Sequence, residues 1–207
     1  FGYDGKGQAR LSTQDDQATA IADMAGQAAV LEGFISFSKE ISIIGARNRA
    51  GDVACFDPGE NIHQAGSLRT TTVPAQINAP QRMDAALFAA KIMNALDYVG
   101  VMGVELFVTG QYLIVNEIAP RVHNSGHWTQ NGCAVDQFEQ HIRAIANWPL
   151  ADGSRHSNVT MTNLIGDDLN ALEALSSQAG TALHLYGKAE IKPGRKMGHY
   201  NSVRPKS

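Results

Sequence analysis

The chain has 207 residues, of which 43% are hydrophobic and 18% charged, a composition typical of a globular protein with a core of its own. Its formal net charge of -3, from 20 acidic and 17 basic residues, excludes a general affinity for polyanions, so we expect no nucleic-acid partner. No apolar run approaches the roughly 20 residues of a membrane span, and Cys55 and Cys133 make no disulfide framework. We therefore expect a cytoplasmic setting and no membrane partner.

The chain begins inside a glycine-rich stretch, FGYDGKGQ, without an initiator methionine. Gly2, Gly5 and Gly7 would let the backbone approach a ligand closely, and Lys6 would add a charge for a phosphate. The spacing matches neither GxxxxGK[ST] nor GxGxxG, so an ordinary hairpin turn stays open as an alternative. Because such a loop needs a strand on each side, we expect a fragment that lacks an N-terminal portion.

A helix followed by strands is predicted for the next part of the chain. Capping residues and helical spacing favour a helix over residues 12–27. Alternation predicts antiparallel strands over 29–37 and 40–47, and a third strand over 52–56. Glu32 and Glu40 fall on the first two of these strands, either as solvated acids at a strand edge or as ligands for the amine and hydroxyls of a nucleotide.

Residues 61–69, NIHQAGSLR, are polar and predict a loop, in which His63 has no evident partner. Three consecutive threonines favour a strand over 68–73. Asn78 then caps a helix that ends near residue 98. Its predicted buried stripe consists of Met83, Leu87, Ala90, Met93 and Leu96.

Residues 101–108 and 112–117 form a predicted hairpin that carries two acids, Glu105 and Glu117. In an antiparallel pair these acids are near cross-strand neighbours, and like charges there repel unless a cation lies between them. Mg2+ prefers oxygen ligands and usually takes one or two carboxylates together with substrate phosphates. The hairpin is therefore a candidate magnesium site.

A dense polar loop, residues 115–129 (VNEIAPRVHNSGHWT), follows these acids. Arg121 in this loop can bind an anion. His123 and His127 have the HxxxH spacing that binds zinc on a helix. The intervening Asn-Ser-Gly favours a loop, so zinc is the weaker alternative.

A helix over residues 136–148, ended by Pro149, closes the main body; we expect Phe138, Ile142 and Ile145 to face inward. Beyond it we predict a strand over 159–165, a helix over 169–175 and a strand pair over 182–186 and 189–191. Lys192, Arg195 and Lys196 follow, as a solvated basic turn or as a phosphate clamp. The expected division is a main domain over 1–148 and a small C-terminal β-rich domain over 149–207.

Five segments in one order carry a resemblance to a known family: GYDGKGQ, EGFISFSKEISIIGAR, NIHQAGSLRTT, VNEIAPRVHNSGHWTQ and KPGRKMGHYN. Together they resemble the ATP-grasp family, and within it the 5-(carboxyamino)imidazole ribonucleotide synthetases of purine biosynthesis, over essentially the whole chain. The resemblance implies an α+β ATP-grasp fold, represented by its central and C-terminal parts. We expect this chain to lack the family's N-terminal domain and the first part of its ATP-grasp fold, which supply a phosphate-contacting lysine and part of the substrate pocket.

The resemblance also implies a reaction. These ligases couple ATP, bicarbonate and 5-aminoimidazole ribonucleotide to give the N-carboxylated product, ADP and phosphate, with bicarbonate activated as carboxyphosphate. Mg2+ is the implied cofactor, and a homodimer the implied assembly. For a chain without the N-terminal portion we expect weak or no turnover.

Site residues carry over by motif, one segment at a time. The resemblance implies metal ligands at Glu105 and Glu117, with Asn116 beside them, and bicarbonate or carboxyphosphate contacts at Arg121 and His123. His123 is suited to shuttle a proton as the amine attacks, and the resemblance implies that Asp4 reaches the aminoimidazole. The implied ATP-binding residues are Tyr3, Gly5, Lys6, Gly7, Gln8, Glu32, Gly33, Phe34, Ile35, Glu40, His63, Asn116 and Glu117. The implied clamp for the substrate phosphate consists of Lys192, Arg195 and Lys196.

Three alternatives remain open. One is another ATP-grasp carboxylate–amine ligase, such as the formate-using purine enzyme or a biotin carboxylase. A second is a catalytically incomplete fragment that only binds nucleotide or dimerises. The third is a zinc hydrolase built on His123 and His127.

Overall fold

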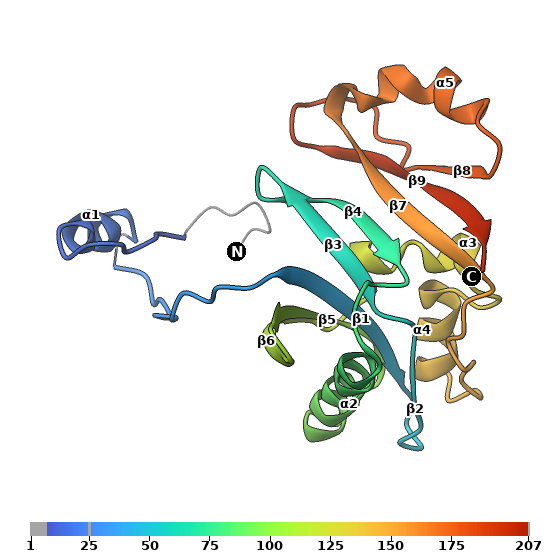
Figure 1. Cartoon of the computed structure of the whole chain (residues 1–207), viewed down its shortest axis with the longest axis horizontal. Coiled ribbons are helices and arrows are strands. Elements are labelled where there is room, and N and C mark those ends of the chain that lie inside the picture. Colours follow the sequence, from blue (N-terminus) through green and yellow to red (C-terminus); the bar gives the residue numbers. More distant parts are fainter. Residues whose placement is uncertain (1–7, 25, 207) are drawn as a thin grey trace.

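A computed structural model describes residues 8–24 and 26–206 of the chain. Within this part an antiparallel sheet of nine strands runs in the order β6-β5-β1-β3-β4-β7-β9-β8, with β2 paired to β1 (Figure 1). The strands are β1 Lys39–Arg47, β2 Val53–Cys55, β3 Gly59–Gln64, β4 Ser67–Val73, β5 Gly100–Thr109, β6 Tyr112–Ala119, β7 Ser157–Ile165, β8 Thr181–Leu185 and β9 Lys196–Pro205. The expected α+β class is confirmed.

Five α-helices and two short 3-10 turns complete the described elements. They are α1 Asp16–Asp23, α2 Ala79–Ala95, η1 Asn124–Gly126, α3 Thr129–Gly132, α4 Gln137–Ile145, η2 Gly166–Ala171 and α5 Leu172–Ser176. No helix in the described ranges is both long enough and apolar enough to cross a membrane. The sheet itself continues from β4 directly into β7, and the division into domains at residue 148 stays a prediction.

The two faces of the sheet carry different side chains, because successive side chains of a strand point to opposite sides. Ile41 and Ile43 of β1, together with Val104 and Leu106 of β5, are fully buried in a cluster that packs against α2. Residues of the other parity, such as Ser42, lie on the opposite face beside η1, α3 and α4. This second face carries the polar site described below.

The hairpin of β5 and β6 forms as expected, but the predicted loop over residues 61–69 is wrong. These residues belong to a second hairpin, β3 and β4, joined by a turn at Ala65 and Gly66 with φ of 48° and 74°. Positive φ at both central residues defines the tight type I′ turn that suits the twist of paired strands. The polarity that favoured a loop reflects exposure of His63 and Gln64 instead.

The N-terminal elements are shorter than predicted. α1 covers eight residues because the Asp16 carboxylate accepts hydrogen bonds from the backbone N–H groups of Ser12 and Thr13, which shapes a turn before the helix. The predicted strand over 29–37 is wrong, since these residues form an extended segment without a strand partner in the described part (Figure 1). Val30 is 86% exposed, so alternation here lacks the neighbour that a strand requires.

Helix α2 begins where expected, with a capping box between Asn78 and Gln81, but its predicted stripe is largely wrong. Met93 is buried and Ala90 half-buried, whereas the remaining three predicted residues, Met83, Leu87 and Leu96, are exposed. The buried residues are Gln81, Ala85, Ala89 and Met93. The small side chains of Ala85 and Ala89 let the helix lie close to β1, where a Cβ on Gly45 would meet the Met93 sulfur at 2.9 Å.

The inward face predicted for α4 is also wrong, since Phe138, Ile142 and Ile145 are 38%, 52% and 43% exposed. Buried instead are Gln137, Gln140 and Ala144, and the two amides bond neighbouring backbone. The α4 helix therefore buries the face that carries its two glutamines and leaves its large apolar side chains exposed.

The C-terminal strand pairing differs from the prediction too. β8 forms, but residues 189–191 lie outside strands, and the partner of β8 is β9. β9 starts at Lys196 and pairs with β7 over nine positions on its other side. The basic turn therefore ends where a central strand of the sheet begins.

Candidate functional site

Glu105 and Glu117 are directly paired across β5 and β6, as the sequence predicted. Glu105 is 8% exposed, while Glu117 on the edge strand is exposed. Burial, followed by the nearby charges of Glu40 and Glu117, raises the pKa of Glu105 from 4.5 to about 7. The fold thus holds a buried carboxylate whose ionised form calls for a cation.

Two further groups approach Glu105, one from neighbouring strands and one from the loop that follows β6. Glu40 on β1 bonds His63 on β3, with 3.3 Å between the Glu40 Oε2 and His63 Nδ1 atoms, and this contact raises the pKa of His63. On the other side, His123 Nε2 lies 3.5 Å from Glu105 Oε1. The structure therefore brings together five predicted site residues from four separate segments.

The donor set fits a hard divalent cation. Glu105, Glu117 and His123 each offer one ligand atom, and these atoms lie within 4.8 Å of one another, as do those of Glu40, His63 and Glu105. Carboxylate oxygens outnumber nitrogens, and the exposed side at Glu117 leaves room for substrate oxygens. Mg2+ usually uses only one or two protein carboxylates together with substrate phosphates.

His123 is fixed by its surroundings on every side. Its backbone N–H donates to Gln137 Oε1 at 2.9 Å, and Gln137 Nε2 donates to its carbonyl at 2.8 Å. The ring lies against Gly103 of β5, where an added Cβ would meet His123 Cβ at 2.7 Å. Burial and the charge of Arg121 lower the pKa of His123 to about 4.

His127 faces away from this cluster. Its ring stacks on His199 at 4.7 Å between centroids, and His199 in turn stacks on His184 at 4.6 Å. Gln137 Nε2 also lies 2.9 Å from His127 Nδ1. Among the described residues, His127 belongs to neither group of possible metal ligands, so the HxxxH spacing builds no zinc site here.

The predicted basic clamp is divided by the fold. Lys196, at the start of β9, is close enough to Glu105 and Arg121 for their charges to act on its ammonium group, and burial lowers its pKa. Lys192 pairs with Glu190 on the surface at 2.7 Å, and Arg195 donates to the Glu190 carbonyl. Lys196 thus faces the carboxylate site, whereas Lys192 and Arg195 share a separate turn.

The remaining predicted residues are more peripheral. Tyr3, Asp4, Gly5, Lys6 and Gly7 lie outside the described residues. Gln8, Glu32, Gly33, Phe34 and Asn116 are exposed and Ile35 is half-buried. The Arg10 guanidinium lies 4.3 Å from the centroid of the Phe34 ring.

Several residues that build the site were not predicted from the sequence. Ser42, Ser125 and Gln137 are at most 2% exposed and contact His123 directly or through one another. Asn124 and Asn163 exchange two side-chain hydrogen bonds of 2.9 and 2.8 Å, which join the loop to β7. Polar side chains on an otherwise apolar strand, such as Ser42 within EISIIGAR, were the only available signal.

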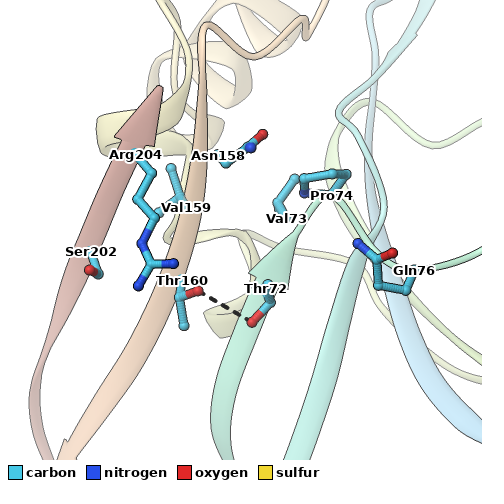
Figure 2. Close-up of a pocket in the computed structure, with 9 residues that line it drawn as sticks. All are labelled: Thr72, Val73, Pro74, Gln76, Asn158, Val159, Thr160, Ser202 and Arg204. Atoms are coloured by element: carbon cyan, nitrogen blue, oxygen red, sulfur yellow. Dashed lines mark hydrogen bonds between the residues drawn. The ribbon is translucent and has the colours of Figure 1, made fainter. Parts of the chain in front are cut away.

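A shallow groove of about 200 Å³ lies on the other face of the sheet (Figure 2). Thr72, Thr160 and Ser202 form a cross-strand row along it, and Arg204 reaches over the row. Residues in this row share their parity with Ile41 of the core face. The groove is therefore separate from the carboxylate site.

Comparison with known proteins identifies the architecture. The model of the ATP-grasp domain family matches residues 1–138, and that of the phosphoribosylaminoimidazole carboxylase C-terminal domain matches residues 159–207. The N5-carboxyaminoimidazole ribonucleotide synthase of Brucella melitensis is 50% identical over 210 residues, covering 100% of this chain and 58% of the relative. The Escherichia coli synthase is 46% identical, covering 97% and 55%.

Solved structures agree. An ADP complex of an N5-carboxyaminoimidazole ribonucleotide synthetase superposes with a TM-score of 0.91 at 39% identity, covering 99% of this chain and 55% of that one. The Aspergillus clavatus synthase in complex with ADP and 5-aminoimidazole ribonucleotide gives 0.90 at 32% identity, covering 95% and 55%.

The chain spans about half the length of the curated relatives it matches. The resemblance to the 5-(carboxyamino)imidazole ribonucleotide synthetases is confirmed by the family models, the curated relatives and the solved structures. With a family model matched over two thirds of its residues, the chain belongs to the ATP-grasp family.

Proposed function

We propose that the chain takes part in the ATP- and bicarbonate-dependent carboxylation of the amino group of 5-aminoimidazole ribonucleotide. The products are the N-carboxyamino ribonucleotide, ADP and phosphate, so the activity is that of a carbon–nitrogen ligase of purine biosynthesis. The observation that carries the proposal is the pairing of Glu105 with Glu117 beside His123. Relatives that share this architecture have been solved with ATP, or with ADP and the aminoimidazole ribonucleotide.

Glu105 and Glu117 would hold the Mg2+ ion, with Asn116 next to them on β6. When bound, the ion supplies neutralisation of phosphate charge. Phosphoryl transfer depends mainly on positioning and on charge neutralisation, so rigid placement of the two carboxylates is the main contribution of this hairpin. Strand pairing supplies that rigidity, because Glu105 lies on β5, which is paired on both sides, with β1 and with β6.

The proposed bicarbonate subsite lies on the next turn of the chain. Arg121 carries a planar guanidinium suited to hold bicarbonate or carboxyphosphate through two oxygens. His123 lies behind it, clamped by Gln137 and in contact with Glu105. Carboxyphosphate hydrolyses readily, so the proposed role of the loop containing Tyr3, Asp4, Gly5, Lys6, Gly7 and Gln8 is to cover the site and exclude water.

The nucleotide and ribonucleotide contacts follow the family pattern. We assign the adenine contacts to Glu32, Gly33, Phe34 and Ile35, the ribose to Glu40, and a further nucleotide contact to His63. Lys192, Arg195 and Lys196 are assigned to the ribonucleotide phosphate. The charge of Glu105 acts on the ammonium group of Lys196. A cytoplasmic location and a homodimer stay predictions.

The test measures ADP release by the 207-residue chain with Mg-ATP, bicarbonate and 5-aminoimidazole ribonucleotide. Slow release that requires all three, and that Glu117→Gln lowers by about 100-fold, is expected from removal of a metal ligand. Glu173→Gln, which alters an exposed acid on α5, is the matched control and leaves the rate unchanged. ADP release that ignores bicarbonate or the aminoimidazole would overturn the proposal.

Parallel measurements separate the alternatives. Stimulation by formate or biotin instead of bicarbonate indicates another ligase of the superfamily. Calorimetric binding of Mg-ATP without any turnover indicates a nucleotide-binding fragment. Stoichiometric zinc in elemental analysis would indicate the hydrolase.

A further inference from the structure

Both ring nitrogens of His123 have partners inside the fold. Nδ1 lies 2.8 Å from the Ser125 hydroxyl oxygen and accepts from the Ser125 backbone N–H at 3.4 Å. Nε2 points the other way and lies 3.5 Å from Glu105 Oε1. The ring therefore connects a serine on η1 with the carboxylate site.

The direction of the hydrogen bonds at Nδ1 follows from their donors. A backbone N–H can only donate, so the nitrogen that faces it carries no proton. The Ser42 hydroxyl donates to Ser125 Oγ at 2.7 Å, which leaves the Ser125 hydroxyl proton directed at Nδ1. Two donors converge on Nδ1, so the ring proton is on Nε2.

No solvent competes with this arrangement. Ser42, Ser125 and His123 are 2%, 1% and 8% exposed. Behind them the buried Asn61 Oδ1 accepts from the Thr71 hydroxyl at 2.9 Å. The Ser42 hydroxyl has one proton, which goes to Ser125 Oγ at 2.7 Å rather than to Asn61 Oδ1 at 3.4 Å. Buried polar groups without water depend on their protein partners, so exchange of the tautomer would leave donors facing one another.

We propose that Ser125, backed by Ser42, is a positioning residue that holds His123 in the tautomer protonated at Nε2, so that His123 donates a hydrogen bond into the carboxylate site. Resting on the proposed function, the acceptor is an oxygen of bicarbonate or of its phosphorylated form. His123 then orients and stabilises an oxyanion, and it does not accept the proton that the amine releases. This assignment replaces the proton shuttle that histidine chemistry suggested from the sequence.

The chemistry suits the position. An N–H donor held beside an anion in a low-dielectric site stabilises charge without reorganising at the moment of reaction. A ring that alternated between tautomers would present a lone pair to the same oxygen half of the time and repel it. The serine pair removes that alternative.

The tautomer is read directly from two-bond proton–nitrogen NMR spectra of the 15N-histidine-labelled 207-residue chain near neutral pH, without ATP. The expected His123 pattern is a protonated Nε2 and an unprotonated Nδ1. A protonated Nδ1, or protons on both nitrogens, would overturn the proposal. The spectrum does not depend on turnover, so it remains informative if the proposed reaction fails.

Variants test the role of the serines. Ser125→Ala is expected to move both nitrogens toward intermediate shifts, and Ser42→Ala, which leaves Ser125 in place, to move them less in the same direction. Ser157→Ala removes a hydroxyl 2.9 Å from the ring of exposed His156 and serves as the matched control, with the His123 signals unchanged. A wild-type pattern in folded Ser125→Ala and Ser42→Ala proteins would refute the serine relay. If Ser125→Ala does not fold, Ser42→Ala decides alone.

Discussion

Replacing Glu105 with Gln is expected to stabilise the metal-free protein at alkaline pH. The Glu105 carboxyl, 8% exposed, has its pKa raised from 4.5 to about 7 by burial and by the charges of Glu40 and Glu117. At about 1.4 kcal/mol for each pKa unit, ionising this group inside the fold costs about 3 kcal/mol relative to the unfolded chain. Gln has the same shape and carries no charge.

The sign follows from proton linkage. Because the folded protein keeps a proton that the unfolded chain has released, the wild type loses stability relative to Glu105→Gln as the pH rises from 4.5 through 7. The free energy of unfolding of the variant therefore exceeds that of the wild type by less than about 1 kcal/mol near pH 5 and by about 3 kcal/mol near pH 8.5. For a chain of this size that difference corresponds to a rise in Tm of roughly 6–12 °C.

The assay is thermal unfolding in EDTA at both pH values, repeated with Mg-ATP. Bound Mg-ATP is expected to reverse the order, because only the wild type keeps the metal-binding carboxylate. Glu173→Gln, on the exposed side of α5, should show no pH-dependent difference from the wild type. A Glu105→Gln protein that is less stable than the wild type near pH 8.5 without metal would refute the reasoning.

Two further predictions concern the residues around His123 and the histidine stack. Gly103→Ala places a Cβ 2.7 Å from His123 Cβ and should lower the free energy of unfolding by about 1–3 kcal/mol in urea titration, whereas Gly33→Ala, with nothing within 4 Å, should not. An unchanged free energy of unfolding in Gly103→Ala would mean that Gly103 does not confine the His123 side chain. Burial lowers the pKa of His199 to about 3 and that of His127 to about 4, so the unfolded chain takes up protons first. The free energy of unfolding should therefore be highest above pH 6.5 and fall as the pH drops below it. His199→Phe should reduce this fall between about pH 6.5 and 5 in urea titration. The same dependence of the free energy of unfolding on pH in both proteins would count against the histidine stack as its cause.

The sequence determined the local parts of the structure whose signal lies within a single element. Tyr112–Ala119 follows Gly100–Thr109 across a short Gly-containing turn, so pairing of Glu105 with Glu117 required only the hairpin. The cap at Asn78 and the strand over β1 were likewise set by neighbouring residues. The order of the five motifs then sufficed to indicate the family.

Elements that needed a distant partner were decided by the tertiary structure. Residues 29–37 have the alternation of a strand but no strand partner in the described chain, while β9, which directly follows a basic turn, pairs on both sides. Likewise α2 and α4 bury amides and alanines, and expose their large apolar side chains, because close approach to the sheet and hydrogen bonds to backbone decide which face packs.

The site shows the same division. Glu105, Glu117 and His123 were recognisable as chemistry-bearing residues from their types and spacing alone. Their environment was not, because Glu40, His63 and Lys196 arrive from separate strands, and Ser42 and Ser125 are 83 positions apart in the chain. A side chain's pKa and tautomer depend on which groups surround it in space, and the sheet's strand order alone brings those groups together.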